Sequence, residues 1–336
     1  MITGDHGIDL EPVRAYPITN SPQSSGHAMG TMATTEKSNL MKTLEKYQEC
    51  LTKKDLPEKT ACIIDGGELL YSSLAGNFRM PTFGDVAKMI ISQAMKFHCK
   101  KVYVLFDTYK KVLIKAFETL RRQGEEPEYK ITGHDQSPGV PVTKVLKNSN
   151  FKQQHAKFLI KELCKDHYAP YLGNKKLYVS LGGNCVLFSS NENSEVLKSV
   201  SSSFQGTHEE VDTLIAFHAW QISGNILVRK SDTDVLVIHV AMLGTAQLDE
   251  QEVPSNKMIM DACDGKSRRL IGVSTIHHNL EQVSAGLSMA LSGLHAFSGY
   301  DYTSCFNGKG KIKPWMLMII DSDYVDLFRS MGSEPD

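Results

Sequence analysis

Acidic residues in well-separated segments are the side chains of this sequence best suited to chemistry. They are Asp65, Asp107, Glu209-Glu210-Val211-Asp212, Asp232-Thr233-Asp234 and Asp301. Carboxylates crowded at one place repel each other and resist ionisation unless a cation is present. Hard oxygen ligands in this number indicate Mg²⁺ or Mn²⁺ rather than zinc. Two such ions about 3.5–4 Å apart would suit phosphodiester hydrolysis, one generating hydroxide and the other stabilising the leaving oxygen.

Each of these acids also has an ordinary structural interpretation. An aspartate after a strand commonly forms a turn or caps the next helix. Acids in the first turn of a helix, such as Glu209, Glu210 and Asp212, favour the positive end of the helix dipole. The catalytic interpretation therefore depends on whether the fold brings the acids together.

Short apolar runs that end at these acids predict buried parallel strands. They cover 61–64 before Asp65, 102–106 before Asp107 and 226–228 before the Asp232-Thr233-Asp234 motif. Amphipathic patterns predict helices near 84–99, 110–122, 151–167, 208–223 and 284–297, and hairpins near 177–188 and 256–273. Alternating strands and helices predict an α/β fold with a mostly parallel twisted sheet flanked by helices. In such a sheet, ligands bind beyond the carboxyl ends of the strands, where the acids stand.

The sequence divides into a leader and one domain. Residues 1–35 are rich in Gly, Ser, Thr, Pro and Met without an apolar period, which predicts a disordered leader. We expect 36–330 to form a single domain. Residues 123–150 turn polar and rich in Gly and Pro, which indicates a mobile insertion that could gate the substrate.

Five motifs in order resemble the flap endonuclease and XPG type of PIN-like nucleases. They are Ile63-Ile64-Asp65, Leu105-Phe106-Asp107, His208-Glu209-Glu210-Val211-Asp212, Ser231-Asp232-Thr233-Asp234 and Ser298-Gly299-Tyr300-Asp301-Tyr302. The resemblance covers about residues 60–320 and is strongest to an uncharacterised animal branch. It implies two metal ions, Mg²⁺ or Mn²⁺. The first-metal ligands would be Asp65, Asp107, Glu210 and Asp212, and the second-metal ligands Asp232, Asp234 and Asp301, with Asp212 near both.

The resemblance also implies contacts to nucleic acid, with DNA favoured over RNA. The segment Phe306-Asn307-Gly308-Lys309-Gly310-Lys311 is similar to the glycine-rich turn of that family's helical DNA clamp, and 298–320 would form a partial clamp. The basic residues after Asp107 correspond to the part of the family that holds the scissile phosphate; they are Lys110, Lys111, Lys115, Arg121 and Arg122. A solvated helix face is the ordinary alternative for these lysines and arginines.

Several departures from the family keep other functions open. The helical motif is Glu210-Val211-Asp212 where the family has Glu-x-Glu, and about sixty residues precede the first strand. Glu209 has no clear counterpart. A phosphatase of the haloacid dehalogenase type would use Asp232 as nucleophile, although its motif normally follows the first strand. A non-catalytic nucleic-acid-binding or scaffold protein could keep the fold without turnover.

Composition excludes several classes of protein. The chain has 336 residues, 41% of them hydrophobic and 22% charged, which is typical of a globular protein. The net charge of −1 excludes binding to nucleic acid through bulk positive charge, though not through local patches. Seven scattered cysteines without a CxxC pair predict neither a zinc ribbon nor a disulfide framework. No apolar run approaches the roughly 18 residues of a membrane span. We expect an intracellular protein, in the nucleus or cytoplasm.

Overall fold

An eight-stranded mixed sheet forms the centre of the molecule, with the order β5-β4-β3-β2-β1-β6-β7-β8. The structure is a computed structural model that describes residues 34–52, 54, 56, 58–74, 81–108, 128–139, 145–248, 257–263, 268–300, 303–306 and 309–331. The strands are β1 (Lys59–Asp65), β2 (Cys99–Leu105), β3 (Lys176–Leu181), β4 (Asn184–Ser190), β5 (Val196–Val200), β6 (Ile226–Arg229), β7 (Met258–Cys263) and β8 (Arg268–Gly272). Strands β3, β2, β1, β6 and β7 run parallel, and antiparallel strands extend the sheet at both ends.

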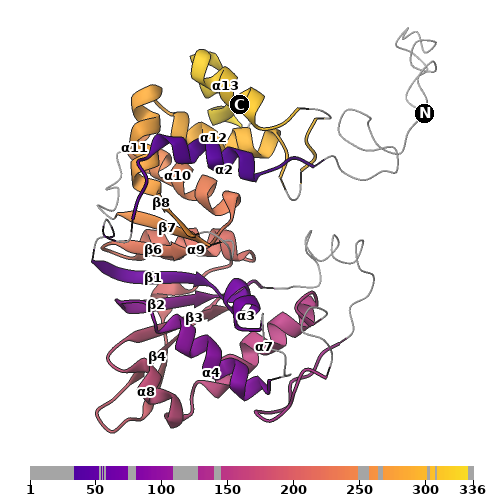
Figure 1. Cartoon of the computed structure of the whole chain (residues 1–336), viewed down its shortest axis with the longest axis vertical. Helices are drawn as coiled ribbons and strands as arrows, with labels where there is room; N and C mark the ends of the chain where they lie inside the picture. Colours follow the sequence, from indigo (N-terminus) through magenta and orange to yellow (C-terminus); the bar gives the residue numbers. More distant parts are fainter. Residues whose placement is uncertain are drawn as a thin grey trace, which may run out of the picture.

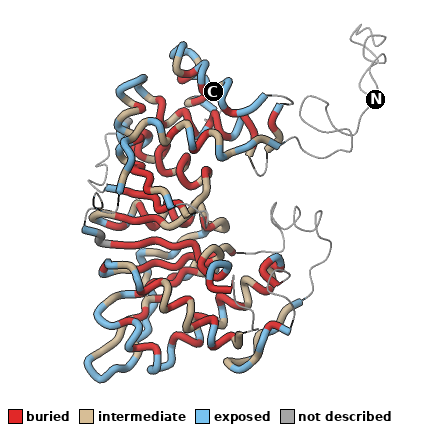
Figure 2. The backbone as a smooth tube through the Cα atoms, viewed as in Figure 1, coloured by how far each residue is buried: buried red, intermediate tan, exposed pale blue. Residues whose placement is uncertain are grey.

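Helices cover both faces of this sheet (Figure 1). One face packs against α3 (Gly66–Leu74), α4 (Phe83–Ala94), α7 (Ser149–Glu162) and α8 (Ala169–Leu172). The other packs against α2 (Ser38–Leu44), α9 (Val211–Gln221), α10 (Thr233–Leu248), α11 (Val273–Val283), α12 (Leu287–Phe297), α13 (Ile312–Ile320) and α14 (Ser322–Ser330). Successive side chains of a strand point to opposite faces, so Ile63 belongs to one core and Ile64 to the other. The parallel strands are buried almost throughout (Figure 2).

Capping side chains decide where several helices begin. Thr82 and Asp85 form a reciprocal capping box at the start of α4, and Asn148 accepts a hydrogen bond from the Phe151 N–H in α7. Both arrangements satisfy N–H groups that have no partner within the helix. At the β8 edge, the side-chain amide of Gln48 donates to the Leu270 carbonyl and accepts from the Gly272 N–H. Gln48 thereby covers backbone groups of an edge strand.

The predicted α/β fold with a mostly parallel sheet is confirmed, together with the hairpins β3–β4 and β7–β8. Strand β5 and helices α3, α8, α10, α11, α13 and α14 were not predicted. The predicted leader lies outside the described residues, except for residues 34 and 35. Of the predicted insertion, residues 128–139 are held by hydrogen bonds to both α4 and the start of α7. No helix of the described residues is long and apolar enough to cross a membrane.

Candidate active site

The carboxyl ends of the central strands meet at a pocket of about 390 Å³. Strand β1 ends at Asp65, β2 is followed by Asp107, and β6 is followed by Lys230. From β1 the chain proceeds to β2 and β3 on one side, and it returns to place β6 on the other side of β1. This is the reversal of strand order at which open α/β sheets bind ligands. Pocket-lining side chains include Asp65, Glu68, Asp107, Lys152, Lys230 and Asp232.

Asp65 has both a structural and an electrostatic role. Its Oδ1 accepts hydrogen bonds from the backbone N–H groups of Gly67 (2.7 Å) and Glu68 (3.2 Å), and so caps α3. Its Oδ2 forms an ion pair with the ammonium group of Lys230. Both side chains are largely buried, so the pair is poorly screened by water. The carboxylate is therefore held in one orientation before any ligand binds.

Asp107 and Asp212 approach the same pair from β2 and α9. Asp107 Oδ1 accepts the Val211 N–H (3.0 Å) and so caps α9 from another segment of the chain. Asp212 Oδ1 lies 3.5 Å from Lys230 Nζ, but it is buried and accepts no hydrogen bond from the described residues. Burial, together with Asp232, Asp65 and Asp107, raises the pKa of Asp212 to about 7 against the attraction of Lys230.

Lys230 supplies the positive charge between Asp65 and Asp212. Burial disfavours its ammonium form, but Asp65 and Asp212 outweigh burial and raise the pKa of Lys230 above its ordinary value. The lysine therefore stays charged at neutral pH, between two carboxylates of neighbouring elements. Lys230 was not predicted as a site residue. The sequence could have indicated Lys230 through its position directly after the central strand β6, because ligands bind beyond the carboxyl ends of such strands.

The second group of predicted acids is arranged around other cations. Asp234 accepts hydrogen bonds from His295 Nε2 (2.9 Å) and Lys37 Nζ (3.1 Å), and these partners lower its pKa although burial acts to raise it. Asp232 lies 3.6 Å from Lys37 Nζ, and its Oδ1 accepts the Asp234 N–H at the start of α10. Asp301 lies outside the described residues. Lys37 and His295 were not predicted, and Lys37 is 197 positions from Asp234 in the sequence.

Glu210 and Glu209 stand at the start of α9. Glu210 is the residue before the first turn, and its side chain makes no capping hydrogen bond. The backbone carbonyl of Glu209 accepts the Thr108 N–H at 2.8 Å, which ties the segment before α9 to the end of β2. The Glu210 carboxylate is thus not used by the helix start, whereas Asp107 performs the capping.

The carboxylate oxygens of Asp212 and Asp65 are of the hard type that divalent cations such as Mg²⁺ prefer. In the described residues, no three His, Cys, Asp or Glu side chains already form a group that could hold a metal ion. Lys230 instead places its positive charge between Asp65 and Asp212. The buried Asp212 Oδ1, which has no hydrogen-bond partner among the described residues, is an oxygen that a cation would satisfy. The Asp234 oxygens, by contrast, are already occupied by Lys37 and His295.

The predicted nucleic-acid contacts are only partly described. Lys110, Lys111, Lys115, Arg121, Arg122 and Gly308 lie outside the described residues. The structure differs from the prediction at Lys311, which is buried. Its Nζ donates to the carbonyls of His295 (3.0 Å) and Gly299 (2.5 Å) and to Ser298 Oγ (3.1 Å). Burial lowers the pKa of Lys311 to about 8. Lys311 therefore supports the Ser298-Gly299 turn from inside, while Lys309 is exposed.

Two glycines of the same region provide a matched pair for mutation. Gly299 has φ +91°, and a Cβ there would lie 2.6 Å from the Cys305 backbone nitrogen. At Gly310 the nearest heavy atom to such a Cβ would be Thr35 Oγ1 at 3.7 Å, an ordinary contact. We expect Gly299→Ala to lower the free energy of unfolding by on the order of 2–3 kcal/mol. Gly310→Ala should change it by less than about 0.5 kcal/mol. Urea unfolding of both variants measures the difference, and equal losses would contradict this account.

Comparison with protein-family models, with curated proteins and with solved structures found no match to this chain. The functional interpretation therefore depends on the geometry of the site and on the sequence motifs.

Proposed function

We propose that this chain is a divalent-metal-dependent nuclease of the PIN-like, flap-endonuclease type. The observation that carries the proposal is the position of Asp212. Its buried Oδ1 receives no hydrogen bond from the part of the chain that the structure describes, and it lies beside the Asp65–Lys230 pair at the edge of the sheet. A carboxylate with a pKa raised to about 7, beside a lysine that lines the pocket, is more typical of a functional group than of a structural one.

Carboxylates in and beside the pocket would hold the ion. Asp65, Asp107 and Asp232 line the pocket and Asp212 lies beside Lys230, and these would supply hard oxygen ligands together with Glu210 at the start of α9. Bound there, Mg²⁺ or Mn²⁺ would lower the pKa of a water and neutralise charge on the phosphodiester. The helix caps made by Asp65 and Asp107 fix these two carboxylates in advance, so an ion would displace Lys230 without reorienting them. We also propose a second ion, held by Asp232, Asp234 and Asp301. The sequence motifs support this second ion.

Cations of the chain would position the substrate. Lys230 and Lys152 both line the pocket that holds the acids. With a divalent ion bound to Asp65 and Asp212, the Lys230 ammonium would be available to contact a phosphate oxygen. Phosphate contacts of this kind supply most of the affinity for nucleic acid without selecting a sequence. DNA is the favoured substrate class.

The proposal is tested by a cleavage assay of the purified full chain. The substrates are single-stranded, duplex and flap DNA and single-stranded RNA, each with Mg²⁺, with Mn²⁺ and with excess chelator. We expect cleavage with either ion, none in chelator, and a loss of about a thousandfold in Asp107→Asn. Asp326→Asn, at an exposed aspartate of α14, is the matched control and should retain activity. Cleavage that persists in chelator would exclude metal-dependent hydrolysis.

A non-catalytic nucleic-acid-binding or scaffold protein is the second candidate. The observation that favours it is Lys230 itself, because a lysine between Asp65 and Asp212 stabilises the acids without any metal. Such a protein would bind the same substrates with an affinity that does not depend on Mg²⁺ or Mn²⁺, and it would cleave none of them. The same assay, with binding measured by fluorescence anisotropy in parallel, separates the two functions.

A further inference from the structure

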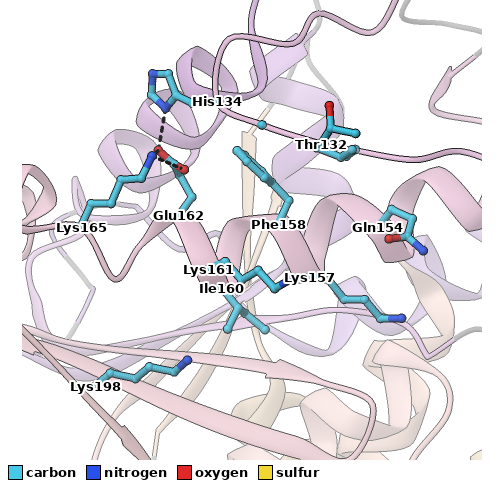
Figure 3. Close-up of a pocket in the computed structure, with 12 residues that line it drawn as sticks. Thr132, His134, Gln154, Lys157, Phe158, Ile160, Lys161, Glu162, Lys165 and Lys198 are labelled. Atoms are coloured by element: carbon cyan, nitrogen blue, oxygen red, sulfur yellow. Dashed lines mark hydrogen bonds and ion pairs between the residues drawn. The ribbon is translucent and has the colours of Figure 1, made fainter.

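A second and larger hollow, of about 600 Å³, lies between α7, residues 131–134 and strand β5. Figure 3 shows Lys157 and Lys161 extending from α7 and Lys198 from β5 on the other side of the space. None of the residues that line it also lines the acidic pocket. The hollow is therefore separate from the acidic pocket, and we call it the lysine groove.

Positive charge predominates in the lysine groove. Lys157, Lys161, Lys165 and Lys198 line it, and among the described lining residues Glu162 is the only acidic one. Glu162 is already used by Lys165, whose Nζ donates to it at 2.8 Å. The ammonium groups of Lys157, Lys161 and Lys198 have no ion-pair partner among the described residues. Three unpaired cations around one hollow create a field that attracts a multiply charged anion.

A buried network fixes the wall of the lysine groove. Glu162 is buried, and its Oε1 is 2.6 Å from His134 Nδ1 and 3.4 Å from the Tyr168 hydroxyl. Burial acts to raise the pKa of Glu162, but Lys165 and His134 outweigh it and lower the pKa below its ordinary range. Glu162 therefore stays ionised and anchors His134. The groove is thus formed before a ligand arrives.

Gly84 allows the same wall to pack closely. The Gly84 N–H donates to the His134 carbonyl at 2.9 Å, and a Cβ at Gly84 would lie 2.1 Å from the His134 ring. Residues 131–134 are consequently attached to the start of α4 as well as to α7. A wall held from two helices is a rigid one, which lowers the entropy lost when a ligand binds.

Apolar side chains complete the lining of the lysine groove. Ile131, Phe158 and Ile160 face the hollow beside the lysines, and Phe158 also packs on Phe83 with ring centroids 5.9 Å apart. The volume lies within the range of about 300–1,000 Å³ that is usual for small-molecule sites and is far larger than an inorganic phosphate needs. A ligand that uses all of these features carries both negative charge and a flat or apolar part.

We propose that the lysine groove binds a phosphate-bearing ligand of nucleotide size. The phosphates would meet Lys157, Lys161 and Lys198, and the base or another flat group would lie against Phe158 and Ile131. This proposal does not depend on the nuclease function, because the groove and the acidic pocket share no lining residue. It assigns a second ligand to the chain at a site separate from the proposed chemistry.

Isothermal titration calorimetry of the full chain tests the class of ligand. The probes are ADP, adenosine, inorganic phosphate and a ten-nucleotide single strand, each without divalent cation. We expect ADP to bind more tightly than adenosine or phosphate and more weakly as salt increases. Phosphate binding as tightly as ADP, or no ADP binding up to millimolar concentration, would overturn the proposal. Binding of the oligonucleotide without ADP would also overturn it and assign the groove to a nucleic-acid strand.

Matched charge removals test the location. The double variant Lys157→Gln/Lys161→Gln should weaken ADP binding by about tenfold or more, since bonds to charged groups typically contribute that much. The control Lys96→Gln/Lys100→Gln removes the same charge at exposed lysines outside the groove and should leave binding unchanged. Phe158→Leu keeps an apolar residue and should weaken ADP binding more than phosphate binding. Equal effects of the two double variants would overturn the assignment to this groove.

Discussion

Replacing Asp212 by asparagine is expected to abolish cleavage and to stabilise the metal-free protein. The folded carboxyl has a pKa of about 7, against 3.8 for the free side chain. A raised pKa means that the folded state holds a proton that the unfolded state releases. The stability from this group is therefore complete below about pH 4 and is lost as the pH rises through 7. Asparagine carries no such cost, so at pH 8 the variant should gain about 1–3 kcal/mol.

The pH dependence of this gain distinguishes it from general effects of mutation. The difference in the free energy of unfolding between Asp212→Asn and the unmodified chain should shrink as the pH falls from 8 toward 4. Over this range the Asp212 carboxyl of the folded protein takes up a proton and becomes neutral, as asparagine is. Urea unfolding at several pH values measures this difference, and single-turnover cleavage should fall about a thousandfold. Asp326→Asn is again the control. A gain that does not change with pH would mean that desolvation of Asp212 is not its cause.

The fold was predictable where apolar runs end at turn-forming residues, as at Asp65, where β1 ends. Other elements depend on contacts that the sequence alone does not display. Helix α3 begins with two glycines, which disfavour a helix, yet Asp65 caps it and compensates. Strand β5 lies at the sheet edge with Leu197 and Val200 exposed, so it lacks the apolar pattern of a buried strand.

The candidate site shows the same division. The motifs predicted that Asp65, Asp107 and Asp212 meet, because parallel strands present their carboxyl ends at one edge. They did not predict that Lys230 would stand between two of these acids, since that depends on β6 pairing with β1. Lys311 was predicted to contact phosphate from its place in a glycine-rich segment. Its burial against the Ser298-Gly299 turn depends on how α12 and α13 pack, which spacing does not reveal.

Replacing Lys230 by methionine should destabilise the metal-free protein and make it responsive to Mn²⁺. The lysine neutralises Asp65 and Asp212 in a poorly solvated place, and methionine leaves both carboxylates without that cation. Removing one member of such a buried group typically costs several kcal/mol, so we expect a loss of about 2–4 kcal/mol at pH 8. If the acids bind a divalent ion, Mn²⁺ at about a hundred times its Kd should restore about 2.7 kcal/mol.

Thermal unfolding of Lys230→Met is measured with Mn²⁺, with Ca²⁺ and without an ion. This measurement distinguishes the metal-dependent nuclease from the non-catalytic scaffold. Lys313→Met, at an exposed lysine of α13, is the control and should leave both the stability and the Mn²⁺ response as they are in the unmodified chain. Restoration of Lys230→Met by Mn²⁺ would mean that the lysine and the metal compete for the same carboxylates, as the nuclease proposal requires. A variant that is destabilised and stays so at saturating Mn²⁺ would show that only a built-in cation fits between Asp65 and Asp212. That outcome would favour the non-catalytic scaffold, because the acids would then serve the fold through Lys230.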